Sequence, residues 1–358
     1  MPLKFRANWS LIAVALLALR ADADGTAWDL EIVPLKPDIY LLQRPEPMRQ
    51  PVEGNVLVIV NERDVVVFEG SGMPVAADNA IRLIRSITRK PVSHLVNSHW
   101  HGDHNLGNQV YRAKYPGITI VAHPATRAAM LGPPFKYVTE FDKDIGPTIA
   151  EWTALKEKGE LSERRARLLD DLNLLITDAR RIAVTPPDLT VADELVLHRG
   201  EREIHIRHLG KGNTEGDLIL WLPRERIVAT ADLVVHPIPY GFGSFPREWI
   251  DTLAGIEALE FELLVPGHGE VQRDRRYLQL LRTMLAAMRA QAADAVAKGL
   301  DLEATRKALD FSAFAPQFPQ DDMGKRLFEA WWTSPISRSL WLEASGKPIV
   351  QADACENN

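Results

Sequence analysis

One short stretch, residues 99–104 with the sequence HWHGDH, constrains this chain more than any other. It holds three imidazoles and one carboxylate: His99, His101, Asp103 and His104. The stretch follows an apolar run that predicts a β-strand, and residues two apart on an extended backbone point the same way, so His99 and His101 can bind one cation. Gly102 allows a tight turn that would carry the next two side chains towards a neighbouring position. The stretch therefore predicts a metal site with room for two ions.

This stretch resembles the HxHxDH signature of the metallo-β-lactamase superfamily, and further segments resemble that family in the same order along the chain. They are residues 54–60 and 65–70 (its first paired strands), 210–217 (its Gly-x-Gly-His-Thr loop), 230–233 (the segment with the bridging aspartate) and 265–269 (the last ligand loop). The resemblance covers roughly residues 30–275. It implies an α/β fold, the four-layer αββα sandwich of that family.

The resemblance also implies the ligands of two metal ions. His99 and His101 would hold metal one, Asp103, His104 and His268 would hold metal two, and Asp232 would bridge both. One ligand position departs from the family, because Asn213 stands where a third histidine for metal one is usual. An amide oxygen is a weaker donor than an imidazole, so metal one is expected to bind loosely, keep an open position for water, or recruit His236.

The chemistry implied by this ligand set is hydrolysis. Zinc suits imidazole and carboxylate ligands and lowers the pKa of a bound water to about 7, which supplies hydroxide at neutral pH. Asp103 is the predicted catalytic residue, because it can orient that hydroxide or take its proton. Asn213, through its NH₂ group, and His236 are the predicted substrate contacts. One or two zinc ions are the expected cofactor, although iron or manganese could replace zinc because affinity alone does not select.

Three functions are compatible with this sequence. The first is an exported metal-dependent hydrolase that uses a metal-bound hydroxide on a small ester, lactone or thioester carbonyl. The second is a β-lactamase of the subclass without a Cys ligand, which the departure at Asn213 disfavours. The third is a catalytically inactive metal-binding accessory protein in the periplasm. A metal-loaded protein that is inactive on esters, thioesters, lactones and lactams would single out the third function.

The N-terminal residues of the sequence indicate export. Residues 1–23 have a basic start, a short apolar run and an A-x-A tripeptide, which is typical of a signal peptide, and a periplasmic or secreted protein is expected. The apolar run is too short for a comfortable membrane span, so no stable span is expected after cleavage. The only cysteine, Cys355, lies in the polar C-terminal tail, so no intramolecular disulfide can form.

Charge gives a weaker constraint on partners. The formal net charge is -6, without a basic run for nucleic acid, so a small-molecule substrate is expected. The oligomeric state is not indicated by the sequence.

The chain is expected to divide into a metallo-β-lactamase-like domain at residues 24–275 and a C-terminal helical extension at residues 276–358. A charged amphipathic stretch within about residues 140–185 predicts an inserted pair of helices, which would either roof the active site or form a dimer contact. The aromatic residues Trp331, Trp332 and Trp341 of the extension are expected to pack in its core. Strands are predicted at residues 92–96 and 227–231, and a helix at residues 78–90.

Overall fold

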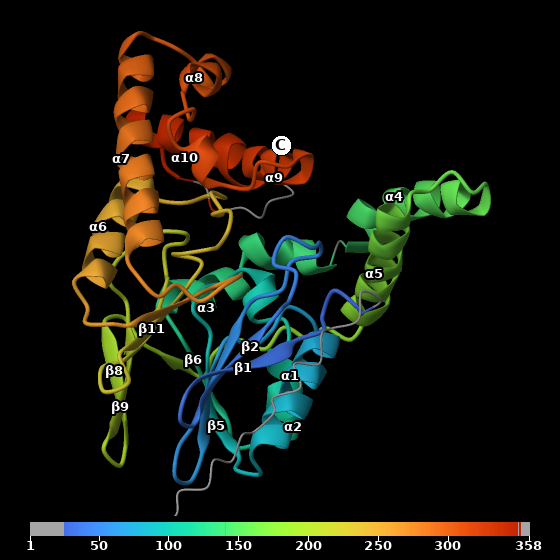
Figure 1. Cartoon of the computed structure of the whole chain (residues 1–358), viewed down its shortest axis with the longest axis vertical. Coiled ribbons are helices and arrows are strands. Elements are labelled where there is room, and N and C mark those ends of the chain that lie inside the picture. Colours follow the sequence, from blue (N-terminus) through green and yellow to red (C-terminus); the bar gives the residue numbers. More distant parts are fainter. Residues whose placement is uncertain (1–24, 140, 350, 352–358) are drawn as a thin grey trace, which may run out of the picture.

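The computed structural model describes residues 25–139, 141–349 and 351. The predicted signal peptide and Cys355 lie outside these described residues. Two β-sheets lie face to face between layers of helices, as Figure 1 shows, and this confirms the predicted αββα class. Among the described helices, none combines the length and the apolar composition that a membrane span requires.

The first sheet comes from the N-terminal half of the chain, with its strands in chain order. They are β1 (Glu31–Lys36), β2 (Ile39–Gln43), β3 (Val56–Val60), β4 (Val65–Phe68), β5 (Val92–Val96), β6 (Thr119–Ala122) and β7 (Leu189–Thr190). The pairs from β1 to β4 are antiparallel and the pairs from β4 to β7 are parallel. The carboxyl ends of β4 and β5 therefore meet at one edge of the sheet.

The second sheet has the order β12-β11-β10-β9-β8. Its strands are β8 (Glu194–Arg199), β9 (Arg202–Arg207), β10 (Ile219–Leu222), β11 (Ile227–Ala231) and β12 (Leu263–Pro266). Only β11 and β12 are parallel neighbours, so their carboxyl ends also lie together. The register shifts between Ala229 and Ala231, at the end of β11, and such irregularities re-aim the side chains that follow.

Side chains along the strands point alternately to the two faces of each sheet, and each face packs against a different layer. In β3, Leu57 and Ile59 pack against the second sheet, whereas Val58 packs against α1 (Pro74–Ile87), so both faces of the strand are buried. The helix α2 (Asn108–Lys114) covers the same outer face through Tyr111. On the second sheet, the outer face packs against α6 (Pro246–Glu257) and α7 (Arg276–Ala297). Each sheet thus has one face in the shared core and one under helices.

The C-terminal helices extend the layer outside the second sheet. They are α7, α8 (Leu302–Ala308), the 3₁₀ turn η3 (Ala315–Gln317), α9 (Asp322–Leu327), the π-helical turn η4 (Phe328–Thr333) and α10 (Ser334–Ala344). The ring of Trp332 is fully buried 5.9 Å from that of Trp249 on α6, and Trp331 contributes to the same apolar cluster. Core packing is therefore one role of this aromatic pair.

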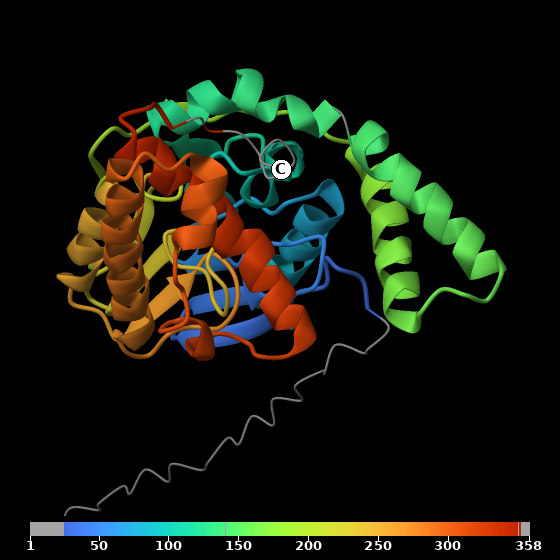
Figure 2. The ribbon, with the colours of Figure 1, turned by 90° about the horizontal axis from the view of Figure 1, so that it is seen from above.

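The inserted segment forms a helical hairpin that stands out from the sandwich. After α3 (Pro124–Met130) and the 3₁₀ segment η2 (Pro133–Thr139), it comprises α4 (Phe141–Glu157) and α5 (Glu163–Ala179). Figure 2 shows this hairpin in green beside the body of the molecule. Two buried carboxylates of α5 attach it: Asp171 accepts a hydrogen bond from the backbone N–H of Ala27, and Asp178 accepts one from Val75 in the first turn of α1.

Boundaries differ from the sequence predictions mainly in the helices. The strands at residues 92–96 and 227–231 agree with β5 and β11. The helix expected at residues 78–90 begins earlier, at Pro74, because proline is well suited to the first turn of a helix. The first helix of the insertion contains Pro147 and starts at Phe141, before the amphipathic pattern becomes regular.

Candidate metal centre

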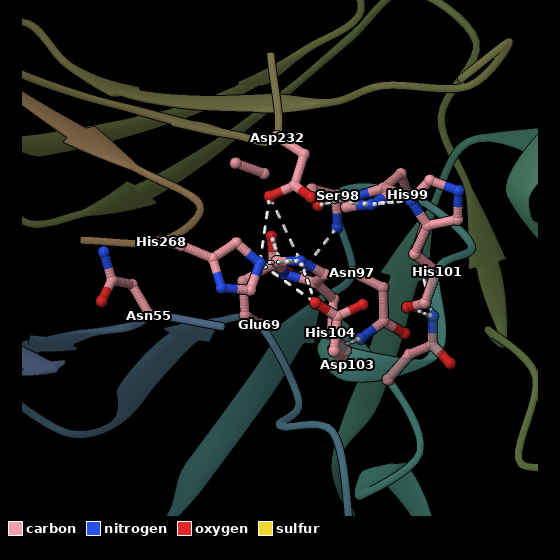
Figure 3. A network of polar contacts seen from close by, with 12 residues as sticks. Asn55, Glu69, Asn97, Ser98, His99, His101, Asp103, His104, Asp232 and His268 are labelled. Atoms are coloured by element: carbon pink, nitrogen blue, oxygen red, sulfur yellow. Dashed lines mark hydrogen bonds and ion pairs between the residues drawn. The ribbon is translucent and has the colours of Figure 1, made fainter. Parts of the chain in front are cut away.

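Each candidate ligand follows the carboxyl end of a strand. β5 leads into the loop with His99 and His101 and then into the 3₁₀ turn η1 (Gly102–His104), β11 leads to Asp232, and β12 leads to His268. Because β4–β5 and β11–β12 are parallel pairs, these ends gather at one edge of the sandwich. Figure 3 shows the side chains pointing towards one another from the loops of both sheets.

Four side chains, Asp103, His104, Asp232 and His268, form what we term the four-donor group. Nε2 of His268 lies 3.0 Å from Oδ2 of Asp103, 3.2 Å from Nε2 of His104 and 3.5 Å from Oδ1 of Asp232. Nε2 of His104 lies 3.4 Å from Oδ2 of Asp103 and 3.3 Å from Oδ1 of Asp232. Donors at about 2.0–2.1 Å from a tetrahedral metal are separated by roughly 3.3 Å. The measured separations therefore fit a four-coordinate metal ion.

The carboxylate of Asp232 supports the same conclusion. Neither of its oxygens accepts a hydrogen bond, although the residue is only 2% exposed. A buried carboxylate without a partner is costly, and a bound cation would satisfy both oxygens. One oxygen faces the four-donor group, and the other, Oδ2, lies 3.8 Å from Nε2 of His99. Asp232 thus has the orientation of a carboxylate that bridges two ions.

His99, His101 and Asp232 form a second set, the three-donor group. Nε2 of His99 lies 3.0 Å from Nδ1 of His101, so the two imidazoles do converge as the spacing of the sequence predicts. The hydroxyl of Ser98 lies 2.8 Å from Nδ1 of His99 and fixes the orientation of that ring. This group offers one donor fewer than the four-donor group.

Asn213 is fully buried, with its two amide atoms in different situations. Its NH₂ group donates a hydrogen bond to the carbonyl oxygen of Tyr240 at 3.1 Å. Its Oδ1 has no hydrogen-bond partner. One N–H of the group expected to bind a substrate oxygen is therefore engaged by the backbone, and the acceptor oxygen is without a partner.

Glu69 stands directly after β4 and beside the four-donor group. Its Oε1 lies 3.7 Å from Nδ1 of His104, and its Oε2 accepts a hydrogen bond from the backbone N–H of Ser98. Because the other nitrogen of His104 faces the donors, Glu69 is placed to orient that ring from behind. Glu69, His99 and His104 also bring donor atoms within 4.8 Å of one another, so Glu69 is close enough to be a ligand itself.

The pKa values of imidazoles from the two groups are shifted in opposite directions. Burial, together with His104 and His101, lowers the pKa of His99 well below its ordinary value, and burial lowers that of His101. Burial acts in the same direction on His104, but the carboxylates of Asp103, Asp232 and Glu69 raise its pKa well above the ordinary value. Burial would raise the pKa of Asp232, but the imidazoles of His104 and His268 lower it to about 2. The carboxylate is therefore held as an anion.

Two glycines permit close approaches at this site. A Cβ on Gly267 would lie 1.9 Å from Oδ1 of Asp232, so the last ligand loop can pass this carboxylate only with glycine there. A Cβ on Gly102 would lie 2.2 Å from the hydroxyl of Tyr137, which accepts a hydrogen bond from the Gly102 backbone. The expected turn at Gly102 is present as η1, and a larger residue there would displace the side chain of Tyr137.

Two buried side-chain amides stabilise the ligand loops, and the backbone is strained at two positions beside the ligands. Ala231, directly before Asp232, has φ of 45°, and Glu69 has φ of 82°, which are conformations that non-glycine residues seldom adopt outside functional sites. The NH₂ group of Asn105 donates to the carbonyls of His99 and His101, and that of Asn55 donates to the carbonyls of Pro266 and Gly269. Sequence reasoning missed these supporting amides, although their positions beside the ligand motifs were a usable signal.

His236 does not reach this cluster. Its ring packs 5.0 Å from that of Tyr277 and is not among the side chains that line the cavity at the donors. The structure therefore does not place His236 as a substitute ligand or a substrate contact. Other imidazoles lie elsewhere: His205 pairs with Glu194, and His208 stacks on His123 at 4.3 Å.

A cavity of about 550 Å³ opens onto the donors. His101, Asp103 and Asp232 line it, and its volume is within the usual range for pockets that bind small molecules. A substrate in this cavity would contact the ligands of both groups. The arrangement can therefore combine metal-assisted chemistry with binding of a small molecule.

Comparison with known proteins agrees with this geometry. The family model of the metallo-beta-lactamase superfamily matches residues 49–268. Two curated relatives named metallo-beta-lactamase type 2 match shorter stretches: one from Bacillus cereus is 31% identical over 81 residues (21% of this chain, 32% of the relative), and one from Bacillus sp. (strain 170) is 28% identical over 127 residues (33% and 46%). The chain thus matches less than half the length of either relative.

Solved structures show the same fold at low identity. A metallo-beta-lactamase from Pontibacter korlensis is 15% identical, with a TM-score of 0.50 over 72% of this chain and 99% of that one. The sec-alkylsulfatase Pisa1 from Pseudomonas sp. is 16% identical, with a TM-score of 0.59 over 88% of this chain and 50% of that one. The family model covers more than half of the sequence and all of the candidate ligands, so this chain belongs to the metallo-beta-lactamase superfamily.

Proposed function

We propose that this chain is a zinc-dependent hydrolase that cleaves a small ester, lactone or thioester. The observation that carries the proposal is the four-donor group, with donor separations of 3.0–3.5 Å at the floor of a cavity for a small molecule. His99, His101, Asp103, His104, Asp232 and His268 would hold the metal. Membership of a superfamily of hydrolases and the set of buried nitrogen and oxygen donors support it.

When bound, a zinc ion lowers the pKa of a coordinated water to about 7 and polarises a carbonyl oxygen. The side chain of Asp103 is 19% exposed and lines the cavity, which supports a role in accepting a proton from a nucleophilic water and in holding that water in position. The buried Oδ1 of Asn213 has no hydrogen-bond partner, which supports a role for this oxygen as a weak metal ligand, while its NH₂ group donates to the carbonyl of Tyr240.

The test combines elemental analysis with a substrate panel. Purified protein is stripped of metal, reloaded separately with zinc, iron or manganese, and assayed on esters, thioesters, lactones and lactams. We expect zinc to restore hydrolysis of an ester, lactone or thioester. Turnover of penicillins or carbapenems alone would instead identify a β-lactamase of the Cys-free subclass. A zinc-loaded protein inactive on the whole panel would identify a metal-binding accessory protein.

We also propose that the protein is exported to the periplasm or secreted, on the basis of the signal-like residues 1–23. The removal of these residues takes away three basic residues and one acidic residue, which leaves 39 basic and 47 acidic. N-terminal sequencing of the protein from fractionated cells tests this. A mature start after Ala23 in the periplasm or medium is expected, and an intact Met1 in the cytosol would contradict it.

A further inference from the structure

We propose that the inserted hairpin and the C-terminal helices form a binding pocket for a long hydrocarbon chain above the metal centre. The substrate would then be a neutral ester, thioester or lactone with such a chain attached. The identity of the reacting group rests on the proposed function, whereas the proposal of a pocket for a hydrocarbon chain does not.

The first wall of the pocket is one face of α4. Phe141, Ile145, Thr148 and Trp152 line the cavity, and their spacing of four, three and four residues places them on a single stripe of the helix. Phe141, Ile145 and Trp152 are only partly buried. An apolar stripe that its own protein leaves half-covered, facing a cavity, is suited to an apolar ligand.

A matching stripe on α5 continues this wall. Leu168, Leu172 and Leu175 line the same cavity at spacings of four and three residues. The hairpin therefore presents the apolar stripes of both helices to one space. Its other surfaces carry exposed charged residues, among them Lys158, Glu163 and Asp170, whereas the guanidinium of Arg165 lies 5.5 Å from the centre of the Trp152 ring. This charge distribution favours a ligand inside the cavity over a second copy of the chain packed on the hairpin.

The opposite side and the floor complete the enclosure. Phe242 and Trp331 line the cavity from the C-terminal side, so Trp331 has a second role beyond its expected core packing. Val52, Met73 and Leu106 add aliphatic surface near the floor. Among the described lining residues, the ionisable groups other than tyrosine are His101, Asp103 and Asp232, and all three are candidate metal ligands. The two tyrosines of the lining are Tyr137, whose hydroxyl accepts a hydrogen bond from the backbone of Gly102, and Tyr240, whose ring packs on that of His268. A reacting carbonyl at the donors would therefore extend its hydrocarbon chain along the hairpin.

The hairpin is fixed in this position by polar contacts on another side of α5. Asp171 forms a salt bridge with Arg49 at 2.8 Å, and Asp178 caps the first turn of α1. Arg164 also contacts Sδ of Met323 on α9, which joins the hairpin to the C-terminal helices. The pocket is therefore formed before a substrate binds, and the free energy of burying a hydrocarbon chain can go into affinity.

The first experiment measures kcat/KM for a series of p-nitrophenyl esters and acyl thioesters: acetate, butyrate, octanoate and laurate. We expect kcat/KM to rise with chain length by up to about fourfold per methylene until the cavity is filled. Leu172→Asn should lower the ratio of kcat/KM for laurate to that for acetate at least tenfold. Leu155→Asn is the matched control, because Leu155 is a partly buried leucine of α4 outside the cavity lining, and the ratio should not change.

The second experiment measures binding without catalysis, with the neutral dye N-phenylnaphthylamine and lauramide as its competitor. We expect the parent and Leu155→Asn to bind the dye and release it to lauramide, and Leu172→Asn and Trp152→Ala to bind it at least tenfold more weakly. Circular dichroism confirms that each variant is folded.

These two measurements separate the pocket from the reaction. Dye binding that depends on Leu172, with no hydrolysis of any ester, would support the pocket and overturn the proposed function. Hydrolysis with no dependence on chain length, and no dye binding, would support the proposed function and overturn the pocket. Equal effects of Leu172→Asn and Leu155→Asn would also overturn the pocket, as would a stable dimer in sedimentation that does not bind the dye.

Discussion

The two ligand groups of this centre share a carboxylate but differ in how complete they are. The four-donor group has five measured donor separations between 3.0 and 3.5 Å. The three-donor group has one close separation, 3.0 Å, and reaches Asp232 only at 3.8 Å. The family resemblance predicts a third imidazole for this group at position 213, where the chain has asparagine. The difference indicates that the two metal positions need not have equal affinity, even when most of their ligands are present.

The largest expected effect comes from His268→Ala, which removes one donor of the four-donor group. We expect metal retention and hydrolysis to fall by more than about 100-fold, because the loss of even an outer-shell partner of a metal site typically costs 10- to 100-fold. Elemental analysis after dialysis and kcat/KM measure this. His205→Ala, which removes an imidazole paired with Glu194 at a distance from the centre, is the control. A His268→Ala protein that holds metal like the parent would remove the basis for ranking this group first.

A smaller loss is expected for Glu69→Gln. The carboxylate of Glu69 lies behind His104 and raises its pKa, so the substitution removes a partner that orients and polarises the ring. We expect metal affinity to fall by about 10- to 100-fold. Competition with a chromophoric chelator measures the affinity. Glu62→Gln, at an exposed glutamate after β3, should not change it. An unchanged affinity in Glu69→Gln would show that this ring needs no support from behind.

Asn213→His tests the incomplete group directly. An imidazole in place of the amide should tighten the second metal by roughly tenfold, or about 1.4 kcal/mol, and raise occupancy towards two ions per chain at limiting zinc. Elemental analysis measures the occupancy. Asn173→His adds a histidine to the exposed surface of α5 and should leave the occupancy at its parent value. If the parent already retains two ions and Asn213→His leaves that number unchanged, the two groups are equivalent in affinity.

The smallest expected effect is a difference in proton release between the groups. Metal ligands must be unprotonated, and the pKa of His104 is raised well above its ordinary value, whereas those of His99 and His101 are lowered. Metal binding to the four-donor group should therefore release a proton at neutral pH, and its affinity should rise by at most about tenfold per unit of increasing pH. The three-donor group should release none.

Calorimetric titration of the Asn213→His protein in two buffers of different ionisation enthalpy counts these protons. Equal proton release for both ions would contradict the electrostatic difference between the groups.

The sequence predicted most of the site because its ligands occur in compact motifs. The spacing of His99 and His101 indicated that both rings could face one cation, and the rings do meet at 3.0 Å. The role of Glu69 was not predicted, since it depends on β4 and β5 lying side by side with a strained backbone at the strand end. The hydrogen bond from the NH₂ group of Asn213 was also not predicted, because its acceptor is the carbonyl of Tyr240, which lies 27 residues further along the sequence. His236 was expected near the pocket, but packs on Tyr277.

By itself the sequence determined the family and predicted several strands and a set of candidate donor residues, because each of these is encoded locally by motifs and by alternation along strands. Only the tertiary structure decided which donor atoms lie close together, since Asp232 reaches both groups through the irregular end of β11. It also decided where the hairpin lies: an amphipathic pattern shows that a face will be covered, but not what covers it. The buried contacts of Asp171 and Asp178 hold the hairpin against the sandwich, and residues of both its helices line the cavity that reaches the donors.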